Sequence, residues 1–326
     1  METSTFRYTE LDFVYQIPPR SHQQRPQLSK FDRELCKRWD EAMAAGVFRY
    51  RIDHILTRTI PGRRQYLAQL NTLRATEKRK GQEFTKVSQP FNDAVFNFSW
   101  VGPEEVIFNL ENRSFSGEEI LRSGDCQREA TTERHTLIVN VSPVEYGHCL
   151  LVPEIDSHRP QVLTETSLRV AIETMLLSQH RGLRMGFNSL CGLASVNHLH
   201  FHLYYLDHKL LVENIPVLPL AGRYFELADH PCPGFALQLH GSTLDDLARE
   251  TYAISSHLNQ NDIAHNLFMT RGSVFGEEDN NTQTTIRLFI WPRKKFTSSE
   301  TTSTDLVPPE EFNVACIELP GHLAVK

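Results

Sequence analysis

Apolar residues recur along the chain with two different periods. Phe31, Leu35, Trp39 and Met43 repeat every four positions, so they lie on one face of a predicted helix at residues 28–48. The same kind of spacing predicts two more helices, at residues 166–180 and 244–258. Alternating or dense apolar runs predict strands at residues 94–100, 105–110, 137–139, 149–152, 265–270 and 285–291, and a strand-rich stretch at 185–206.

A helix between strands occurs twice, which predicts an α+β fold with antiparallel sheets, packed helices and two related halves. Residues 1–26 are polar and are expected to form an extended N-terminal arm. A proline-bearing connector near 207–235 separates the two halves, which are expected at residues 27–210 and 211–326. The Ser/Thr-rich segment near 294–304 is expected to be mobile.

Composition narrows the possible functions. The net charge is −6, from 34 basic and 40 acidic residues, so no overall positive field attracts nucleic acid or anionic lipid. The N-terminus lacks the apolar core of a secretory signal, and no stretch approaches the roughly 18 apolar residues of a membrane span. The six cysteines are dispersed, without a Cys-x-x-Cys pair, which favours reduced thiols and a cytoplasmic location.

The most informative stretch is residues 197–205, in which His198, His200 and His202 alternate with apolar residues. In a strand, the three imidazoles share one face. Three interpretations remain open at this point. The alternation can arise by chance, it can provide His-x-His ligands for zinc, or it can supply a nucleophile, because neutral imidazole attacks phosphorus well near pH 7. The zinc interpretation lacks a nearby Asp, Glu or Cys ligand on the same face.

The segment resembles the histidine triad of the histidine-triad superfamily, in which the middle histidine is the nucleophile. Residues 140–153 resemble the superfamily's Gly-His strand segment, here with His148. Further motifs occur in order with the triad and are similar to those of the GDP-hexose phosphorylases: Gln69-Leu70-Asn71, Gln89-Pro90-Phe91-Asn92, Phe96-Asn97-Phe98, Gly102-x-Glu104-Glu105-Val106 and Phe187-Asn188-Ser189-Leu190. The resemblance is strong over residues 60–206. Plant members of this family carry Gln at the third triad position, so His202 places the chain nearer the animal members, which act on GDP-D-glucose.

The resemblance implies a histidine-triad-like fold in which residues 27–210 are catalytic and residues 211–326 form a degenerate half. It also implies a two-step reaction, in which GDP-glucose and inorganic phosphate give glucose 1-phosphate and GDP through a GMP–histidine intermediate on His200. No metal or cofactor is required, because imidazolium and backbone donors supply the electrostatics. Some hydrolysis is expected where water replaces phosphate. A homodimer is compatible with the resemblance.

Around His200, the resemblance gives His198 and His202 the role of stabilising charge and holding the tautomer, and His148 that of orienting His200 or touching phosphate. The small polar side chains just before the triad can hold phosphate oxygens through hydrogen bonds, although an Asn-Ser pair is also common in turns. A cationic cluster could contact the nucleotide, although Lys/Arg runs more often form a solvated face. The expected substrate-binding residues are Asn188, Ser189, Asn71, Arg74 and Lys78.

Three other functions remain open: a triad hydrolase or nucleotidyltransferase of other specificity, a zinc-dependent hydrolase, and a non-catalytic nucleotide binder.

Overall fold

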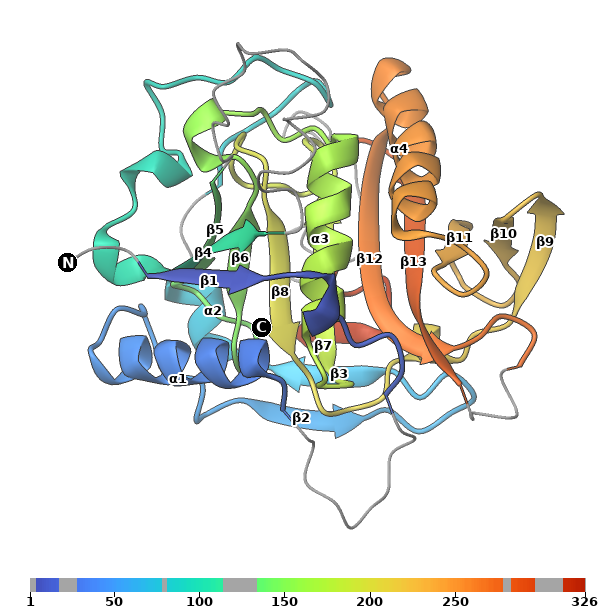
Figure 1. The fold of residues 1–326 in the computed structure, drawn as a ribbon, viewed down its shortest axis with the longest axis horizontal. Coiled ribbons are helices and arrows are strands. Elements are labelled where there is room, and N and C mark those ends of the chain that lie inside the picture. The colour runs from blue at the N-terminus through green and yellow to red at the C-terminus, as the bar shows by residue number, and fades with distance from the viewer. Residues whose placement is uncertain are drawn as a thin grey trace, which may run out of the picture.

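The protein is built on one large mixed sheet with helices packed against one face (Figure 1). The structure is a computed structural model, and it describes residues 4–17, 28–77, 81–113, 134–277, 283–296 and 313–325. In the described part, eleven strands form the large sheet in the order β1-β4-β5-β6-β8-β7-β12-β13-β11-β10-β9. Three more strands form a small sheet in the order β14-β3-β2.

The strands of the large sheet are β1 (Thr5–Tyr8), β4 (Val106–Asn112), β5 (His135–Val139), β6 (Cys149–Val152), β7 (Leu183–Asn188), β8 (Phe201–Tyr205), β9 (Val217–Ala221), β10 (Tyr224–Leu227), β11 (Phe235–Gln238), β12 (Ala264–Ser273) and β13 (Thr284–Arg293). The small sheet contains β2 (Leu56–Thr59), β3 (Leu67–Leu70) and β14 (His322–Val325). The helices are α1 (Lys30–Ala44), α2 (Thr72–Glu77), α3 (Glu165–Leu177) and α4 (Leu244–Gln260).

The predicted α+β fold is confirmed, and two similar units lie side by side within the sheet. One unit contributes β4, β5, β6, β8 and β7 with α3, and the other contributes β12, β13, β11, β10 and β9 with α4. An antiparallel ladder between β7 and β12 joins them, and it pairs Asn188 with Asn266. The two units therefore form one continuous sheet.

Alternation along the strands separates the helix-covered face from the opposite face. Figure 1 shows α3 and α4 lying over the sheet, and Phe201, Leu203 and Tyr205 of β8 belong to the core beneath the helices. Tyr204 points to the other side, where it packs with a second apolar cluster. Because side chains alternate along a strand, His202 also faces away from the helices.

Helix ends follow their capping residues. Ser29 caps α1 and forms a capping box with Asp32, and Thr164 and Thr243 cap α3 and α4 through their hydroxyls. The three helices predicted from periodicity are all present, with ends within a few residues of the prediction.

Two predictions about local structure were wrong. Residues 94–100 do not form a strand; they fold as a turn followed by a 3-10 helix at Phe98–Trp100, which Asn97 caps. The alternation of Phe96 and Phe98 arises because both rings line a cavity. The proline-bearing connector also contains two strands, β9 and β10, and it leads directly into a third, β11, at the far end of the sheet.

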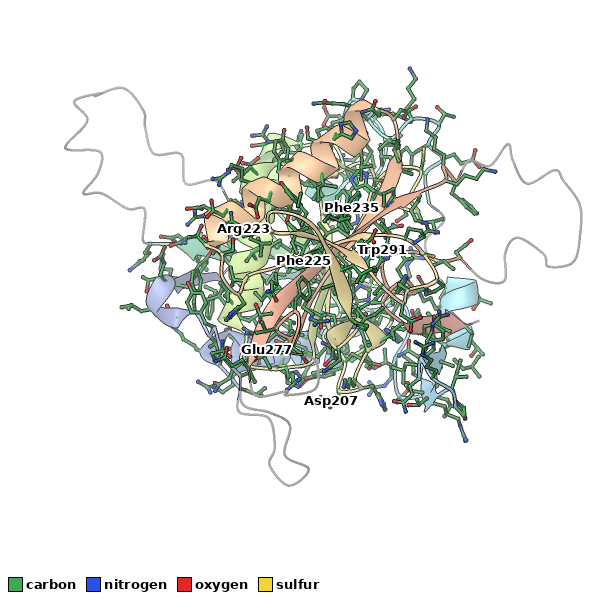
Figure 2. All side chains as sticks on the ribbon, turned by 90° about the vertical axis from the view of Figure 1, so that its right-hand side faces the viewer. Asp207, Arg223, Phe225, Phe235, Glu277 and Trp291 are labelled. Atoms are coloured by element: carbon green, nitrogen blue, oxygen red, sulfur yellow. The ribbon has the colours of Figure 1, made fainter. Side chains whose placement is uncertain are left out.

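Figure 2 views that end, where Phe225, Phe235 and Trp291 lie around the crossing strands. Trp291 is fully buried there. A proline is tolerated within β9 because this strand is an edge, where a missing N–H costs little.

The expected extended arm and mobile segment are described only in part. Within the arm, β1 pairs with β4 in parallel, while residues 18–27 lie outside the described residues. Of the Ser/Thr-rich segment, residues 297–304 lie outside them as well. Residues 295 and 296 are anchored: Lys295 pairs with Asp262, and the Phe296 amide donates to the Cys191 carbonyl at 2.8 Å. None of the helices in the described ranges is both long and apolar enough to cross a bilayer.

Candidate active site

The three triad histidines are not all on one strand. β8 begins at Phe201, so His202 lies in the strand while His198 and His200 precede it. The Leu199 amide donates to the Arg159 carbonyl at 2.9 Å, and the His200 amide donates to the Gln161 side chain at 2.9 Å. The sheet ladder therefore does not extend to these residues, and the prediction of a single strand carrying all three rings was wrong.

His200 is buried beside a cavity and carries a nucleophilic nitrogen. Its Nδ1 lies 2.7 Å from the His198 carbonyl oxygen, which can only accept, so Nδ1 carries the proton. Nε2 therefore keeps its lone pair, and His200 lines the cavity. Burial lowers the pKa of His200 to about 4, against the opposing effect of the His198 carbonyl. The ring is neutral and nucleophilic at pH 7.

His202 and His148 form a second hydrogen-bonded pair beside His200. The Val144 amide donates to His148 Nδ1 at 3.0 Å, which places the proton of a neutral His148 ring on Nε2. That Nε2 lies 3.1 Å from His202 Nδ1 and 3.2 Å from the Asn140 side-chain nitrogen, Nδ2. Because the Asn140 nitrogen is itself a donor, His202 is the acceptor. The proton of a neutral His202 ring is then on Nε2.

His198 lies behind the catalytic ring and is not among the cavity-lining residues. Its Nδ1 accepts the Phe98 amide at 3.2 Å, and Phe98 packs edge-on against His200 with ring centroids 4.9 Å apart. Burial, with His200 and His158 nearby, lowers the pKa of His198 to about 3. His198 thus acts on His200 through its own carbonyl and through Phe98, and not by direct contact with a ligand in the cavity.

Gln161 holds His200 in place, a role that no motif in the sequence predicts. Its side chain is 1% exposed, accepts from the His200 amide, and donates to the carbonyls of Asn188 at 2.9 Å and His200 at 3.2 Å. Its own backbone amide donates to Asn197 Oδ1 at 2.9 Å. A single amide therefore couples the triad segment to β7. Its partners are distant in sequence, so only the fold brings them together.

Of the two small polar residues before the triad, the structure brings Asn188 to the cavity and not Ser189. Asn188 Oδ1 accepts from the Asn266 side chain at 2.6 Å and from the Cys316 amide at 2.9 Å, which leaves the NH2 group as the end it can offer. The Ser189 hydroxyl instead donates to the Leu190 carbonyl and accepts from the His265 amide, and Ser189 does not line the cavity.

Asn266 was assigned no role from the sequence. It donates to Asn188 and, at 2.7 Å, to the Gly192 carbonyl. Gly192 permits this close packing, because a Cβ there would lie 2.7 Å from Ser189 Oγ. Residues of the second unit therefore support the site directly.

The expected nucleotide contacts Asn71 and Arg74 both line the cavity. Asn71 is buried, donates to the Pro143 carbonyl at 3.3 Å and contacts His54 Nε2 at 3.2 Å. The Arg74 guanidinium donates to the Ser142 carbonyl. Lys78 lies outside the described residues.

The motifs quoted from the sequence converge around the triad. The Asn197 side chain donates to the carbonyls of Gln89 and Pro90, and Phe91 packs edge-on against His198 with centroids 5.0 Å apart. Apolar side chains line much of the cavity. Lining residues that the sequence did not single out include Val101, Ile138, Leu150, Val196, Asn313, Ala315, Ile317, Glu318, Ala324 and Val325. Within the described ranges, no group of three His, Cys, Asp or Glu residues is arranged to hold a metal ion.

Comparison with known families identifies the chain. A family model described as "GDPGP1-like, N-terminal domain" matches residues 30–204, and its partner, "GDPGP1-like, C-terminal domain", matches residues 212–326. The chain belongs to the GDPGP1-like family.

Relatives of this family cover the chain almost completely. The GDP-D-glucose phosphorylase 1 of Danio rerio is 41% identical over 330 residues, covering 100% of this chain and 88% of the relative. The Bos taurus protein of the same name is 42% identical over 306 residues, covering 92% of this chain and 75% of its own. The GDP-L-galactose phosphorylase 2 of Arabidopsis thaliana is 30% identical over 298 residues, covering 88% and 66%.

Among solved structures, yeast Ap4A phosphorylase Apa2 in complex with Ap4A has a similar fold. The TM-score is 0.58 at 15% identity, covering 91% of this chain and 90% of that chain. The fold of this GDPGP1-like chain is thus shared with a nucleotide phosphorylase of very different sequence, and the predicted histidine-triad-like fold is confirmed.

Proposed function

We propose that the protein is a GDP-D-glucose phosphorylase that converts GDP-glucose and inorganic phosphate into glucose 1-phosphate and GDP. The observation that carries the proposal is the hydrogen bond from His200 Nδ1 to the His198 carbonyl, which leaves the Nε2 lone pair available on a neutral ring that lines the cavity. Relatives named GDP-D-glucose phosphorylase 1, about 41% identical over almost the whole chain, support the choice of substrate.

In the first step, His200 Nε2 attacks the α-phosphorus of GDP-glucose. The bond from the α-phosphorus to the bridging oxygen breaks, its electron pair leaves on glucose 1-phosphate, and GMP remains on His200. The ring becomes cationic when this bond forms, and the His198 carbonyl stabilises it by accepting from Nδ1–H. Donors beside His200, the His202 Nε2–H and the Asn188 NH2 group, stabilise the phosphoryl oxygens.

In the second step, an oxygen of inorganic phosphate attacks the same phosphorus. The P–N bond breaks, the electron pair returns to Nε2, and GDP leaves. Water attacking in place of phosphate gives GMP, which accounts for a side hydrolase activity. No step depends on a metal ion, so the reaction is expected to proceed in metal-stripped protein.

The test is a phosphorolysis assay. Metal-stripped protein is incubated with GDP-glucose and inorganic phosphate, with UDP-glucose and GDP-mannose in parallel, and GDP and glucose 1-phosphate are followed. Both products are expected from GDP-glucose. UDP-glucose should release UDP and glucose 1-phosphate only slowly, and GDP-mannose should release GDP and mannose 1-phosphate only slowly. His200→Ala should abolish turnover, whereas His257→Ala, on the exposed side of α4, serves as the matched control. Turnover by His200→Ala near the wild-type rate would contradict covalent catalysis, and activity lost on chelation would favour the zinc hydrolase.

Two further properties belong to the same proposal. The described cysteines Cys36, Cys149, Cys191, Cys232 and Cys316 are free, which supports a reducing compartment such as the cytoplasm. Fractionation of cells that express the protein tests this location. A homodimer is also proposed, and sedimentation equilibrium of the purified chain tests it.

A further inference from the structure

One wall of the cavity carries a buried hydroxyl that has no partner. Ser142 lines the cavity and is 4% exposed, and its Oγ has no hydrogen-bond partner among the described residues. Leaving a hydroxyl buried and unsatisfied is unfavourable, so such a group in a cavity indicates a ligand that completes its hydrogen bonding. The Ser142 amide is held by Asn140 Oδ1 at 3.0 Å, so the hydroxyl is carried on a fixed backbone.

Arg74 adds positive charge at the same place. Its guanidinium donates to the Ser142 carbonyl, and its backbone amide donates to Asn71 Oδ1 at 3.1 Å. Among the described cavity-lining residues it is the one Lys or Arg side chain. A guanidinium carries five N–H donors in a planar fork, so the bond to Ser142 leaves donors for a phosphate.

The polar wall is continuous with the nucleophile. The His200 ring neighbours that of His202, and His202 contacts His148. His148 in turn contacts the Asn140 side chain, which holds the Ser142 amide, and the Ser142 carbonyl accepts from Arg74. Apolar side chains also line the cavity, among them Phe96, Phe98, Val101, Ile138 and Leu150. A flat nucleobase suits these apolar side chains, and phosphate suits Arg74.

The chemistry requires the leaving and the entering group to occupy one position. Both displacements take place at the same phosphorus and are in line, so each group lies opposite His200 Nε2. We propose that Ser142 and Arg74 form a single phosphate subsite, which holds the β-phosphate of the nucleotide sugar in the first step and inorganic phosphate in the second. This inference rests on the proposed function and assigns its acceptor site.

Another residue of the cavity is consistent with this assignment. Glu318 lines the same cavity, and its Oε2 accepts the Ala315 amide at 2.8 Å. A carboxylate accepts hydrogen bonds only, so it suits the hydroxyl groups of the hexose that is attached to the β-phosphate. The leaving glucose 1-phosphate then has its phosphate on Arg74 and its sugar toward Glu318.

The decisive readout is the ratio of GDP to GMP formed at a fixed phosphate concentration. Water needs no anion subsite, so loss of the subsite should lower phosphorolysis more than hydrolysis of the same intermediate. Arg74→Gln is expected to lower the ratio by about tenfold or more, and Ser142→Ala by about threefold to tenfold, as expected for losing charged and neutral donors to phosphate. Arg74→Lys should fall between wild type and Arg74→Gln.

The ratio is internal to the active molecules, so partial misfolding does not change it. Arg58→Gln, an exposed arginine on the neighbouring strand β2, is the matched control and should leave the ratio unchanged. If Arg74→Gln and Ser142→Ala lower GDP and GMP formation by the same factor, both residues are structural and the subsite is refuted.

A binding measurement separates this inference from the proposed function. Titration with glucose 1-phosphate needs no turnover, so it can be carried out even if the wild-type protein fails to convert GDP-glucose. Arg74→Gln should weaken that binding about tenfold. Equal affinity in the wild type and the variant would overturn the subsite whether or not the enzyme turns over.

Discussion

Replacing Gln161 by leucine removes the clamp on the catalytic histidine without a large change in side-chain volume. The Gln161 amide satisfies three backbone groups: the His200 amide, the His200 carbonyl and the Asn188 carbonyl. Leaving a buried polar group without its partner costs about 1–3 kcal/mol. Taking the low value for each group, Gln161→Leu should lower the free energy of unfolding by about 3 kcal/mol.

The same change should slow the first half-reaction, because misplacing a nucleophile by about 1 Å can cost about 100-fold in rate. Urea unfolding measures the stability, and a rapid-quench assay of glucose 1-phosphate release measures the rate. Gln260→Leu, on the exposed end of α4, is the control and should change stability by less than about 0.5 kcal/mol. A Gln161→Leu protein with wild-type stability and a rate within twofold of wild type would refute the clamp.

Three other predictions concern the site and its buried histidines. His202→Gln should keep turnover within about tenfold of wild type, because Gln accepts from His148 and donates to phosphate as His202 does. His202→Leu should lower turnover about 100-fold. Steady-state kinetics measures both variants, and equal losses would contradict the assigned tautomer. Asn266→Asp should lower kcat about 100-fold by reorienting the Asn188 amide, and in an Asn188→Ala background it should add little; additive losses would contradict coupling. Burial lowers the pKa of His198, His200, His265 and His322 to between about 3 and 4, so the unfolded chain binds more protons below pH 6.5 and stability falls as the pH is lowered. Linkage lowers the free energy of unfolding by about 0.7 kcal/mol per histidine between pH 7 and pH 6, or about 3 kcal/mol for the four. Urea unfolding at the two pH values measures this loss, and an unchanged free energy of unfolding would contradict their burial as neutral rings.

Periodicity predicted the helices because each buries one apolar face against the sheet, as Phe31, Leu35 and Trp39 do in α1. The strand prediction for residues 94–100 failed because alternation there serves the cavity: Phe96 and Phe98 line it, and Asn97 caps a 3-10 helix. The local pattern does not distinguish these two causes.

The site was predicted where its residues carry a motif and missed where only contacts define it. His200, His202 and His148 follow from the triad and from the Gly-His segment. Gln161 and Asn266 were missed because their partners lie 27 to 78 positions away in the chain, so no local spacing records them. Glu318 and Ser142 also line the cavity, and only the fold brings them there.

The central claim, covalent catalysis at His200, is tested most directly by trapping the intermediate. The protein is mixed with GDP-glucose in the absence of phosphate, quenched in alkali within milliseconds to seconds, and analysed by intact-protein and peptide mass spectrometry. The account predicts one GMP group on His200, formed together with glucose 1-phosphate, discharged to GDP when phosphate is added, and absent from His200→Ala. Release of glucose 1-phosphate in a single turnover with no nucleotide on any histidine at any time would contradict the account.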